Sequence, residues 1–194
     1  MKRWDIINKY IKKNGYKDYL EIGLQSGLCR DNIVVKNKTT VDPDVRSDNP
    51  THTMTSDEFF AQNKNKFDVI FIDGLHHGDQ VLKDIENSLA VLKDGGMIFC
   101  HDMLPNSEIV QAVPRKQAIW TGNCWQAWAK LKGTRKNLSM FIVEDDWGVG
   151  VIKRGKQKTH PELDVPLDKM DWAFFLEHKS KFNYKNAEEF SKML

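Results

Sequence analysis

Two short segments of the sequence carry side chains that could do acid–base or metal chemistry. The segments FIDGLHHGD (residues 71–79) and FCHDM (residues 99–103) each continue a run of apolar residues. Their acids and histidines are Asp73, His76, His77, Asp79, His101 and Asp102. If the two apolar runs are neighbouring parallel strands, their carboxyl ends meet at the edge of a sheet, where open α/β folds place their ligands. We therefore predict one polar site built from both segments.

Asp73 and Asp102 are candidate ligands for a divalent cation, because two carboxylates with an imidazole nearby offer donors that suit Mg²⁺ or Ca²⁺. Such a cation would act as a Lewis acid and lower the pKa of a substrate hydroxyl group. A histidine, whose ordinary pKa lies near neutrality, could then accept the proton, and His76 and His101 are the candidates for this base. A structural alternative stays open, in which Asp73 caps the following loop and Asp102 caps a helix. We expect His77 to be a structural or solvent-facing neighbour.

A glycine-bearing loop, YLEIGLQSGL (residues 19–28), has the spacing Glu21-x-Gly23-x-x-x-Gly27. A dinucleotide-binding loop would carry a further glycine between these two, and a phosphate-binding loop would need Gly-Lys-Ser/Thr. The acid would repel a pyrophosphate, but it suits a ligand with an amine and a sulfonium, such as S-adenosylmethionine (SAM). Asp42 follows Glu21 by 21 residues, where an acid commonly hydrogen-bonds ribose hydroxyl groups. A plain tight turn is the alternative for the glycines.

The spacing of apolar residues predicts the elements that position these side chains. Residues 1–15 have helical spacing that ends at Asn14-Gly15. Four segments read as strands, and their continuous apolar character favours a parallel sheet buried on both faces. These strands are DYLEIG, KTTVDP, FDVIFIDG and GGMIFCHD. A helix that ends at Gly95-Gly96 separates the last two, so we predict a doubly wound, Rossmann-like α/β sheet that is mostly parallel.

The C-terminal third departs from this alternation. Residues 119–133 (IWTGNCWQAWAKLKG) read as a helix with an aromatic lead-in. Residues 138–155 (LSMFIVEDDWGVGVIKRG) read as two strands joined by a short turn, which predicts an antiparallel hairpin at the end of the sheet. We expect Asp145 and Asp146 to shape this turn and Trp147 to cover its base.

One domain is predicted for residues 1–194, with an N-terminal helix (1–15), a core (16–155) and C-terminal helices (165–194). The C-terminal helices could pack on their own domain or on a second copy of the chain. Between the second and third strands, THTMT (residues 51–55) reads as a weak edge strand that is followed by a short helix.

The ordered set of motifs resembles a class I SAM-dependent methyltransferase. The set comprises the glycine loop, the strand-terminal Asp42, FDVIFIDGLH, LKDGGMIFCHD and the terminal hairpin, from about Tyr19 to Lys153. It is most similar to the small branch with an IDG-x-H motif, which includes sugar and antibiotic O-methyltransferases. The resemblance implies a seven-strand methyltransferase sheet flanked by helices.

The resemblance also implies roles for individual residues. The implied contacts to SAM are Glu21, Gly23, Gly27, Asp42, Met54, Thr55 and Asp73, with Asp42 on the ribose and Met54 and Thr55 beside the adenine. In metal-dependent members of the branch the Asp of the motif is a metal ligand and the His is the base, and these roles fall on Asp73 and His76. Such members present two adjacent acids at the end of the next strand, whereas this chain has His101-Asp102. Asp102 is then the second metal ligand, and His101 could serve as a base instead.

The leading prediction is a SAM-dependent O-methyltransferase that acts on a hydroxylated small molecule such as a sugar, with Mg²⁺ as a candidate second cofactor. Methylation of a nucleic acid or an amine is the first alternative. Amine-directed enzymes usually carry Asn/Asp-Pro-Pro-aromatic where this chain has DGLH, and the net charge of +2 argues against a large RNA partner. The second alternative is a non-catalytic scaffold, which would need a glycine turn but not Asp73, His76 and Asp102 together.

Composition bounds these readings. The 194 residues, of which 40% are hydrophobic, fit one domain with a substantial core. Three cysteines without paired spacing, one of them within the apolar run MIFC, favour free thiols in a reducing compartment. The basic N-terminus lacks the apolar stretch of a signal peptide and no run approaches membrane length, so we expect a cytoplasmic protein without a membrane partner.

Three tryptophans, Trp120, Trp125 and Trp128, precede or lie within the predicted helix at residues 119–133. They could stack on a sugar or pack against the sheet, and we expect at least one of them to be core. Selectivity for the acceptor would come from the loop at residues 103–125, from the C-terminal helices or from a partner subunit.

Overall fold

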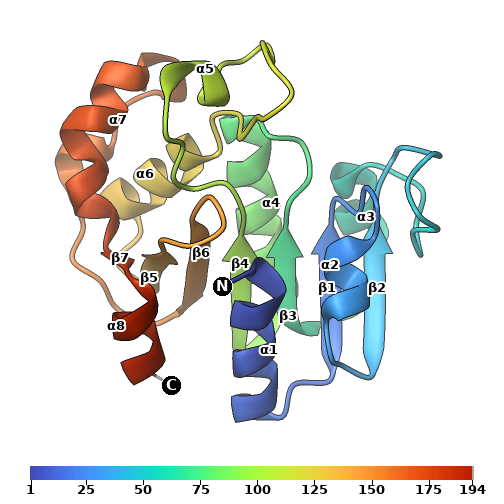
Figure 1. Cartoon of the computed structure of the whole chain (residues 1–194). Helices are drawn as coiled ribbons and strands as arrows, with labels where there is room; N and C mark the ends of the chain where they lie inside the picture. Colours follow the sequence, from blue (N-terminus) through green and yellow to red (C-terminus); the bar gives the residue numbers. More distant parts are fainter. Residues whose placement is uncertain (194) are drawn as a thin grey trace.

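One mixed sheet forms the middle layer of the computed structural model, which describes residues 1–193 (Figure 1). Its strands are β1 (Asp18–Ile22), β2 (Asn37–Val41), β3 (Phe67–Ile72), β4 (Leu92–Cys100), β5 (Leu138–Val143), β6 (Val149–Arg154) and β7 (Tyr184–Lys185). Across the described residues these seven strands have the order β2-β1-β3-β4-β6-β5-β7. Strands β1 to β4 are parallel, whereas β6 is antiparallel to both β4 and β5. The predicted parallel sheet with a C-terminal antiparallel hairpin is confirmed.

Helices cover both faces of the sheet. The α-helices are α1 (Arg3–Asn14), α2 (Leu28–Asn32), α3 (Ser56–Gln62), α4 (Gly78–Val91), α5 (Glu108–Gln111), α6 (Trp125–Thr134), α7 (Trp172–His178) and α8 (Ala187–Lys192). Short 3-10 helices are η1 (Pro161–Leu163), η2 (Leu167–Lys169) and η3 (Lys179–Phe182). Helices α1, α2 and α8 contribute to the apolar cluster on one face, and α3, α4, α6 and α7 to the cluster on the other (Figure 1).

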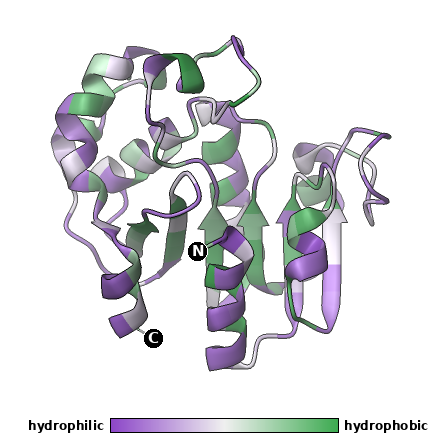
Figure 2. Ribbon diagram, in the orientation of Figure 1, coloured by the Kyte–Doolittle hydropathy of each residue, from purple (hydrophilic) through white to green (hydrophobic). Residues whose placement is uncertain are grey.

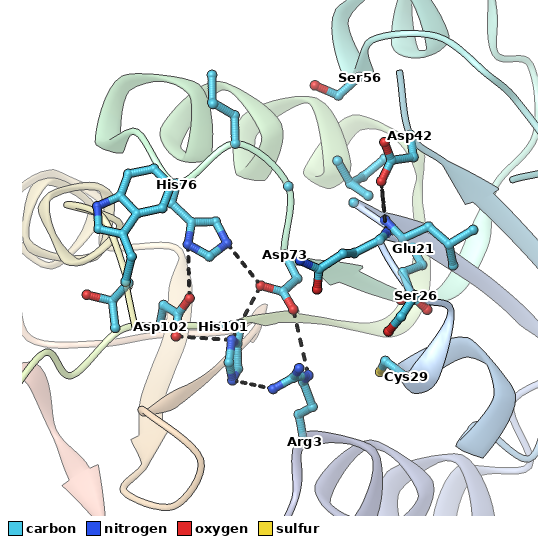
Figure 3. A pocket seen from close by; sticks show the side chains of 18 of the residues that line it. Arg3, Glu21, Ser26, Cys29, Asp42, Ser56, Asp73, His76, His101 and Asp102 are labelled. Atoms are coloured by element: carbon cyan, nitrogen blue, oxygen red, sulfur yellow. Dashed lines mark hydrogen bonds and ion pairs between the residues drawn. The ribbon is translucent and has the colours of Figure 1, made fainter. Parts of the chain in front are cut away.

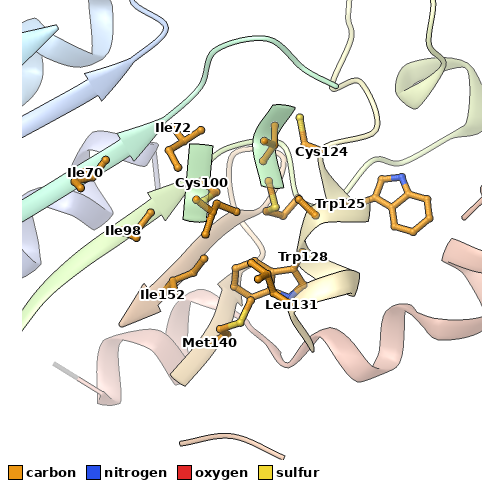
Figure 4. Packing of buried hydrophobic residues seen from close by; sticks show 14 of the residues in the cluster. Ile70, Ile72, Ile98, Cys100, Cys124, Trp125, Trp128, Leu131, Met140 and Ile152 are labelled. Atoms are coloured by element: carbon orange, nitrogen blue, oxygen red, sulfur yellow. The ribbon is translucent and has the colours of Figure 1, made fainter. Parts of the chain in front are cut away.

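Strand β3 shows why both faces are covered. Its residues alternate in direction, so that Val69 and Phe71 join one cluster while Ile70 and Ile72 join the other. Figure 2 shows β3 and β4 in the green of apolar residues, as expected for strands without a solvent-facing side. In Figure 4, strand side chains such as Ile70 and Ile72 lie in the same cluster as Trp125 of α6.

Strand pairing at the two edges of the sheet differs from the prediction. The THTMT segment is no strand, because its link to β2 is a single bridge between Val41 and His52. Pro50 lacks an N–H group, and the Thr51 N–H donates to the Thr40 side chain rather than to a main-chain carbonyl, so the ladder does not extend. At the opposite edge β7 adds two residues beside β5.

For residues 165–194 the sequence predicts helices alone. The prediction is wrong in part, because strand β7 lies between η3 and α8. Strand β7 satisfies main-chain groups of the exposed edge, since the Glu144 N–H donates to the Lys185 carbonyl (3.0 Å). Phe175, Phe182 and Phe190 are buried, so these elements pack against their own chain.

Helix α4 ends earlier than predicted, at Val91 rather than at Gly95-Gly96. The two glycines lie inside β4, beside a shift in its register with β3 between Phe67 and Val69. The earlier helix end is explained by Leu92. This residue begins β4, and its side chain is buried there.

The three cysteines, Cys29, Cys100 and Cys124, are buried free thiols. The prediction of free thiols is confirmed. Over residues 1–193, no helix combines the length and the apolar character needed to cross a membrane.

Candidate functional site

A cavity of about 840 Å³ opens at the carboxyl ends of the parallel strands. Main-chain hydrogen bonds bring the residues after each strand together. The Gly23 N–H donates to the Val41 carbonyl (2.8 Å), the Asp73 N–H to Ile22 (2.8 Å) and the His101 N–H to Ile72 (3.0 Å). Each functional loop therefore begins beside the end of the neighbouring strand.

Four predicted residues form one cluster on a wall of the cavity (Figure 3). His101 Nδ1 lies 3.3 Å from Asp73 Oδ1 and 3.1 Å from Asp102 Oδ1. His76 Nε2 lies 3.4 Å from Asp73 Oδ1, and His76 Nδ1 lies 3.2 Å from Asp102 Oδ2. The structure thus brings the segments at residues 71–79 and 99–103 into a single polar site.

Asp102 has a left-handed backbone, with φ of +62°, although it is not glycine. Its side chain is almost fully buried, at 4% exposure. A non-glycine residue in this region carries strain that the surrounding structure must compensate, and such residues are common at functional sites. The conformation turns the Asp102 carboxylate toward both histidines.

Two further residues, Arg3 and Asp146, complete the cluster and were missed at the sequence level. Arg3 Nη1 lies 2.8 Å from His101 Nε2 and 3.1 Å from Asp146 Oδ2, and Arg3 Nε lies 3.6 Å from Asp73 Oδ2. The Arg3 N–H also donates to Asp146 Oδ2 (2.9 Å). The hairpin turn therefore supplies an acceptor for a main-chain donor in the first turn of α1, a group that a helix itself leaves unpaired. No local pattern in the sequence indicates this contact, because Arg3 and Asp146 are 143 positions apart.

Charges within the cluster shift its pKa values in opposite directions. Burial lowers the pKa of His76, but Asp73 and Asp102 raise it, and the net direction is upward. The pKa of His101 is likewise raised well above its ordinary value, because Asp73, Asp102 and Asp146 outweigh burial. Burial raises the pKa of Asp73, but the two histidines hold it well below its ordinary value. Asp73 is therefore charged at neutral pH and favours the cationic form of each ring.

The contact between Arg3 and His101 acts against this preference. A guanidinium group only donates hydrogen bonds, so His101 Nε2 accepts from it only in the neutral ring that carries its proton on Nδ1. That proton then faces Asp73 and Asp102.

Glu21 lies on the glycine-loop side of the cavity. Its carboxyl group is 1% exposed and accepts a hydrogen bond from the Tyr19 hydroxyl (2.6 Å). Burial raises the pKa of Glu21 to about 8, although the Tyr19 hydrogen bond lowers it. Glu21 is therefore mostly protonated at neutral pH, and a cationic ligand group would favour its ionised form.

Asp42 holds the glycine loop from within. Its Oδ2 accepts from the N–H groups of Leu24 (2.8 Å) and Gln25 (3.0 Å), and its Oδ1 accepts from the Asp44 N–H (2.8 Å). Burial raises the pKa of Asp42, but these hydrogen bonds lower it by a larger amount. The pKa of Asp42 is therefore below its ordinary value. Asp42 also lines the cavity, so the carboxylate predicted for the ribose has a structural role as well.

Gly23 allows the glycine loop to approach β3 closely. It has φ of +85°, and a Cβ atom there would lie 2.2 Å from the Asp73 carbonyl oxygen. No other residue fits this position without moving the loop that carries Asp73. Gly27, which lines no part of the cavity that the described residues form, caps α2 at its N-terminus.

Of the two residues predicted to lie beside the adenine, Thr55 lines the cavity and Met54 does not. Thr55 lines the cavity and caps α3, with its side chain accepting from the Glu58 N–H. Met54 packs against the core instead, with its sulfur 2.9 Å from Gln62 Nε2. Ser56 and Asp57 line the cavity beside Thr55.

The three tryptophans separate into core and site. Trp125 and Trp128 are fully buried in the apolar cluster. Trp120 lines the cavity and stacks on His76, with ring centroids 5.2 Å apart and an interplanar angle of 17°. His77 faces Trp120 edge-on at 6.3 Å.

The donor set fits one divalent cation. Ligand atoms of Asp73, His76 and Asp102 all lie within 4.8 Å of one another. His76 Nδ1 is buried and has no hydrogen-bond partner among the residues that the structure describes. The two carboxylates offer oxygen ligands of the kind that a hard cation such as Mg²⁺ prefers.

Comparisons with known proteins agree with this architecture. Residues 20–103 match the family model of a methyltransferase domain. A search of curated proteins found no match. Solved structures similar to this chain include a methyltransferase of Podospora anserina with bound S-adenosylhomocysteine, with a TM-score of 0.60 and 17% identity over 79% of this chain and 77% of that one.

Two further similar structures have O-methyltransferase names. A putative O-methyltransferase from Klebsiella pneumoniae has a TM-score of 0.61 and 13% identity, over 80% of each chain. An O-methyltransferase from Bacillus cereus in complex with S-adenosylhomocysteine has a TM-score of 0.52 and 14% identity, over 77% of this chain and 78% of that one. At these identities the likeness shows the fold.

Proposed function

We propose that this chain is a SAM-dependent methyltransferase that transfers the methyl group to a hydroxyl oxygen of a small molecule. Its fold and the match of residues 20–103 to a methyltransferase domain support the cofactor. The observation that carries the proposal is the position of His76, which lies between Asp73 and Asp102 in the same cavity as the glycine loop. The names of the Klebsiella pneumoniae and Bacillus cereus structures support the choice of oxygen as the acceptor atom.

The cavity has room for a cofactor and a small acceptor together, since its 840 Å³ lies toward the upper end of the range of ligand pockets. We place SAM along Glu21, Gly23, Asp42 and Thr55. The acceptor then lies beside His76, against the loop that carries Trp120. A sugar hydroxyl group, as in the IDG-x-H branch, is the acceptor that we propose to test first.

His76 can accept the hydroxyl proton in its neutral form. With the ring proton on Nδ1, the buried nitrogen that lies 3.2 Å from Asp102 Oδ2, the lone pair is on Nε2. Bound SAM would supply the methyl group: the acceptor oxygen would attack the methyl carbon, the sulfur would keep the electron pair of the broken bond, and the hydroxyl proton would pass to Nε2. The new N–H would then face Asp73 Oδ1, with Nε2 and Oδ1 3.4 Å apart, and the charge of Asp73 would stabilise the imidazolium.

Asp73 and Asp102 would hold a divalent cation, and the cation would supply a Lewis acid that lowers the pKa of the acceptor hydroxyl group. His76 carries a proton on Nδ1 and accepts one on Nε2, so neither nitrogen is left to bind a metal, and we assign the cation to the two carboxylates. His101 takes the place of one acid of the metal-dependent enzymes, and its Nδ1 contacts the same two carboxylates. Its position keeps those carboxylates oriented.

The test is a His76→Asn substitution, with formation of S-adenosylhomocysteine measured over a panel of hydroxylated acceptors that begins with sugars. We expect kcat to fall by about 10² to 10⁴. The affinity for S-adenosylhomocysteine, measured by calorimetry, should stay unchanged, because His76 lies on the acceptor side of the cavity. His77→Asn is the matched control and should retain activity.

Two results would contradict the proposal. A His76→Asn variant with the wild-type kcat would remove His76 as the base. A folded wild-type protein that binds no S-adenosylhomocysteine would remove the cofactor assignment itself.

A further inference from the structure

The imidazole ring of His76 is covered by a segment from a different part of the chain. His76 lies in the loop between β3 and α4, whereas Trp120 lies in the loop before α6. Their rings are nearly parallel, at 17°, with centroids 5.2 Å apart, and both line the cavity. An acceptor in the cavity and the Trp120 indole would therefore both lie beside the His76 ring.

Main-chain contacts hold the two loops together. The Asn123 N–H donates to the His76 carbonyl (3.3 Å), and Asn123 Oδ1 accepts from the Gly78 N–H (2.8 Å). The chain at Gly122 lies so close that a Cβ atom there would be 1.9 Å from the His76 carbonyl oxygen. Residues 120–123 thus wrap around His76 on both its main-chain and its side-chain sides.

Trp120 is itself held in place. Its Nε1 donates to the Ala112 carbonyl (2.6 Å), and the Arg115 guanidinium carbon lies 5.7 Å from its ring centroid. Arg115 in turn donates through Nε to the Gln117 carbonyl (2.8 Å). Arg115 also donates to the Ala118 carbonyl, so both of these hydrogen bonds stay within the loop. The indole is therefore a fixed surface.

We infer that Trp120 is a positioning residue, which holds the His76 imidazole with one nitrogen toward Asp73 and the other toward Asp102. The inference rests on the proposed role of His76 as the base. Rotation about the bond between Cβ and the imidazole ring has a broad energy profile, so covalent geometry alone does not fix the ring plane. The indole face restricts that rotation, which keeps Nε2 aligned with the acceptor hydroxyl group.

A double-mutant cycle tests this inference, with kcat measured in single turnovers. Trp120→Leu should lower kcat about tenfold or more, because a small misplacement of a base has a large effect on rate. The affinity for S-adenosylhomocysteine should not change. Trp120→Phe, which keeps an aromatic face, should recover most of the rate.

The cycle is completed on the His76→Asn background, where Trp120→Leu should change the remaining rate less than twofold, because Trp120 acts through His76. An equal loss on both backgrounds would overturn the inference, and so would a wild-type kcat for Trp120→Leu. If His76→Asn alone kept the wild-type kcat, the proposed function would fail instead.

A spectroscopic measurement separates positioning from a general effect on folding. The ring protons of His76 lie against the indole, so its ring current shifts their NMR signals. Trp120→Leu should move these signals, while Lys116→Ala, an exposed site in the same loop, should leave them in place. Signals that stay in place in Trp120→Leu would overturn the inference.

Discussion

Arg3 Nη1 lies 2.8 Å from His101 Nε2, although 98 positions separate the two residues along the chain. The same guanidinium group contacts Asp73 and Asp146. One cation at the start of α1 therefore joins the ends of β3 and β4 to the turn between β5 and β6. The N-terminal helix takes part in the candidate active site and does not only cover the sheet.

Removal of this cation should destabilise the protein. For Arg3→Ala we expect the free energy of unfolding to fall by about 2 to 3 kcal/mol, because Asp146 loses a charge-assisted hydrogen bond and Asp73 loses a neighbouring cation. Urea unfolding would measure this as a lower midpoint with an unchanged slope. Lys2→Ala is the matched control. Lys2 Nζ contacts Asp146 at 3.4 Å, but its side chain is 61% exposed, so we expect a loss under about 1 kcal/mol. Equal losses in the two variants would contradict the role of Arg3.

Gly23→Ala should disrupt the contact between the glycine loop and β3. A methyl group would meet the Asp73 carbonyl oxygen, and the backbone at φ of +85° would be strained as well. We expect a loss of about 3 kcal/mol or more in the free energy of unfolding, together with loss of S-adenosylhomocysteine binding. Gly95→Ala separates the two effects, because Gly95 has φ of +75° but nothing within 4 Å of the added atom. The Gly95→Ala variant should lose only about 1 kcal/mol in the free energy of unfolding. A similar loss for Gly23→Ala would show that the close approach of Gly23 to Asp73 is unimportant.

Glu21 should make stability depend on pH. Its pKa in the folded protein is about 8, against an ordinary value of 4.5. Between these values the folded chain keeps a proton that the unfolded chain has lost, so the free energy of unfolding falls as the pH rises. Glu21→Gln removes this contribution. The stability of the variant relative to the wild type should therefore increase from about pH 5 to about pH 8, by up to about 1 kcal/mol per pH unit, and then level off. A constant difference across this range would show that Glu21 is ionised in the folded protein.

Chelation tests the cation that we propose at Asp73 and Asp102. Removal of divalent ions should lower kcat about tenfold or more, and added Mg²⁺ should restore it. In Asp73→Asn, Mg²⁺ should no longer restore the rate, while S-adenosylhomocysteine should still bind. If chelation leaves the wild-type rate unchanged, the metal assignment is wrong.

The parts of the site that could be predicted share a simple physical origin. The runs FDVIFI and GGMIFC are apolar on both faces, and parallel strands of this kind must end at a common edge. Asp73 and His101 follow those ends directly, so their proximity required no knowledge of side-chain packing. The hairpin was predictable from the turn residues between two strand-like runs.

The missed parts depend on tertiary packing. Arg3 and Asp146 are 143 positions apart, and their contact exists because α1 packs beside the hairpin turn. Strand β7 has two residues, too few to show any alternation. Trp120 differs from Trp125 and Trp128 only in lying before the helix rather than within it, and their sequence context could not separate a site residue from core residues.

The buried Glu21 would couple cofactor binding to the uptake of protons by the surrounding buffer. A carboxyl group with a pKa of about 8 carries its proton at neutral pH, and a cationic amine or sulfonium placed beside it would drive that proton off. Binding would then release up to one proton per chain, and the measured heat would vary with the ionisation enthalpy of the buffer. Affinity for the cofactor would rise with pH up to about pH 8, so the glycine loop that we propose for SAM would also make binding depend on pH.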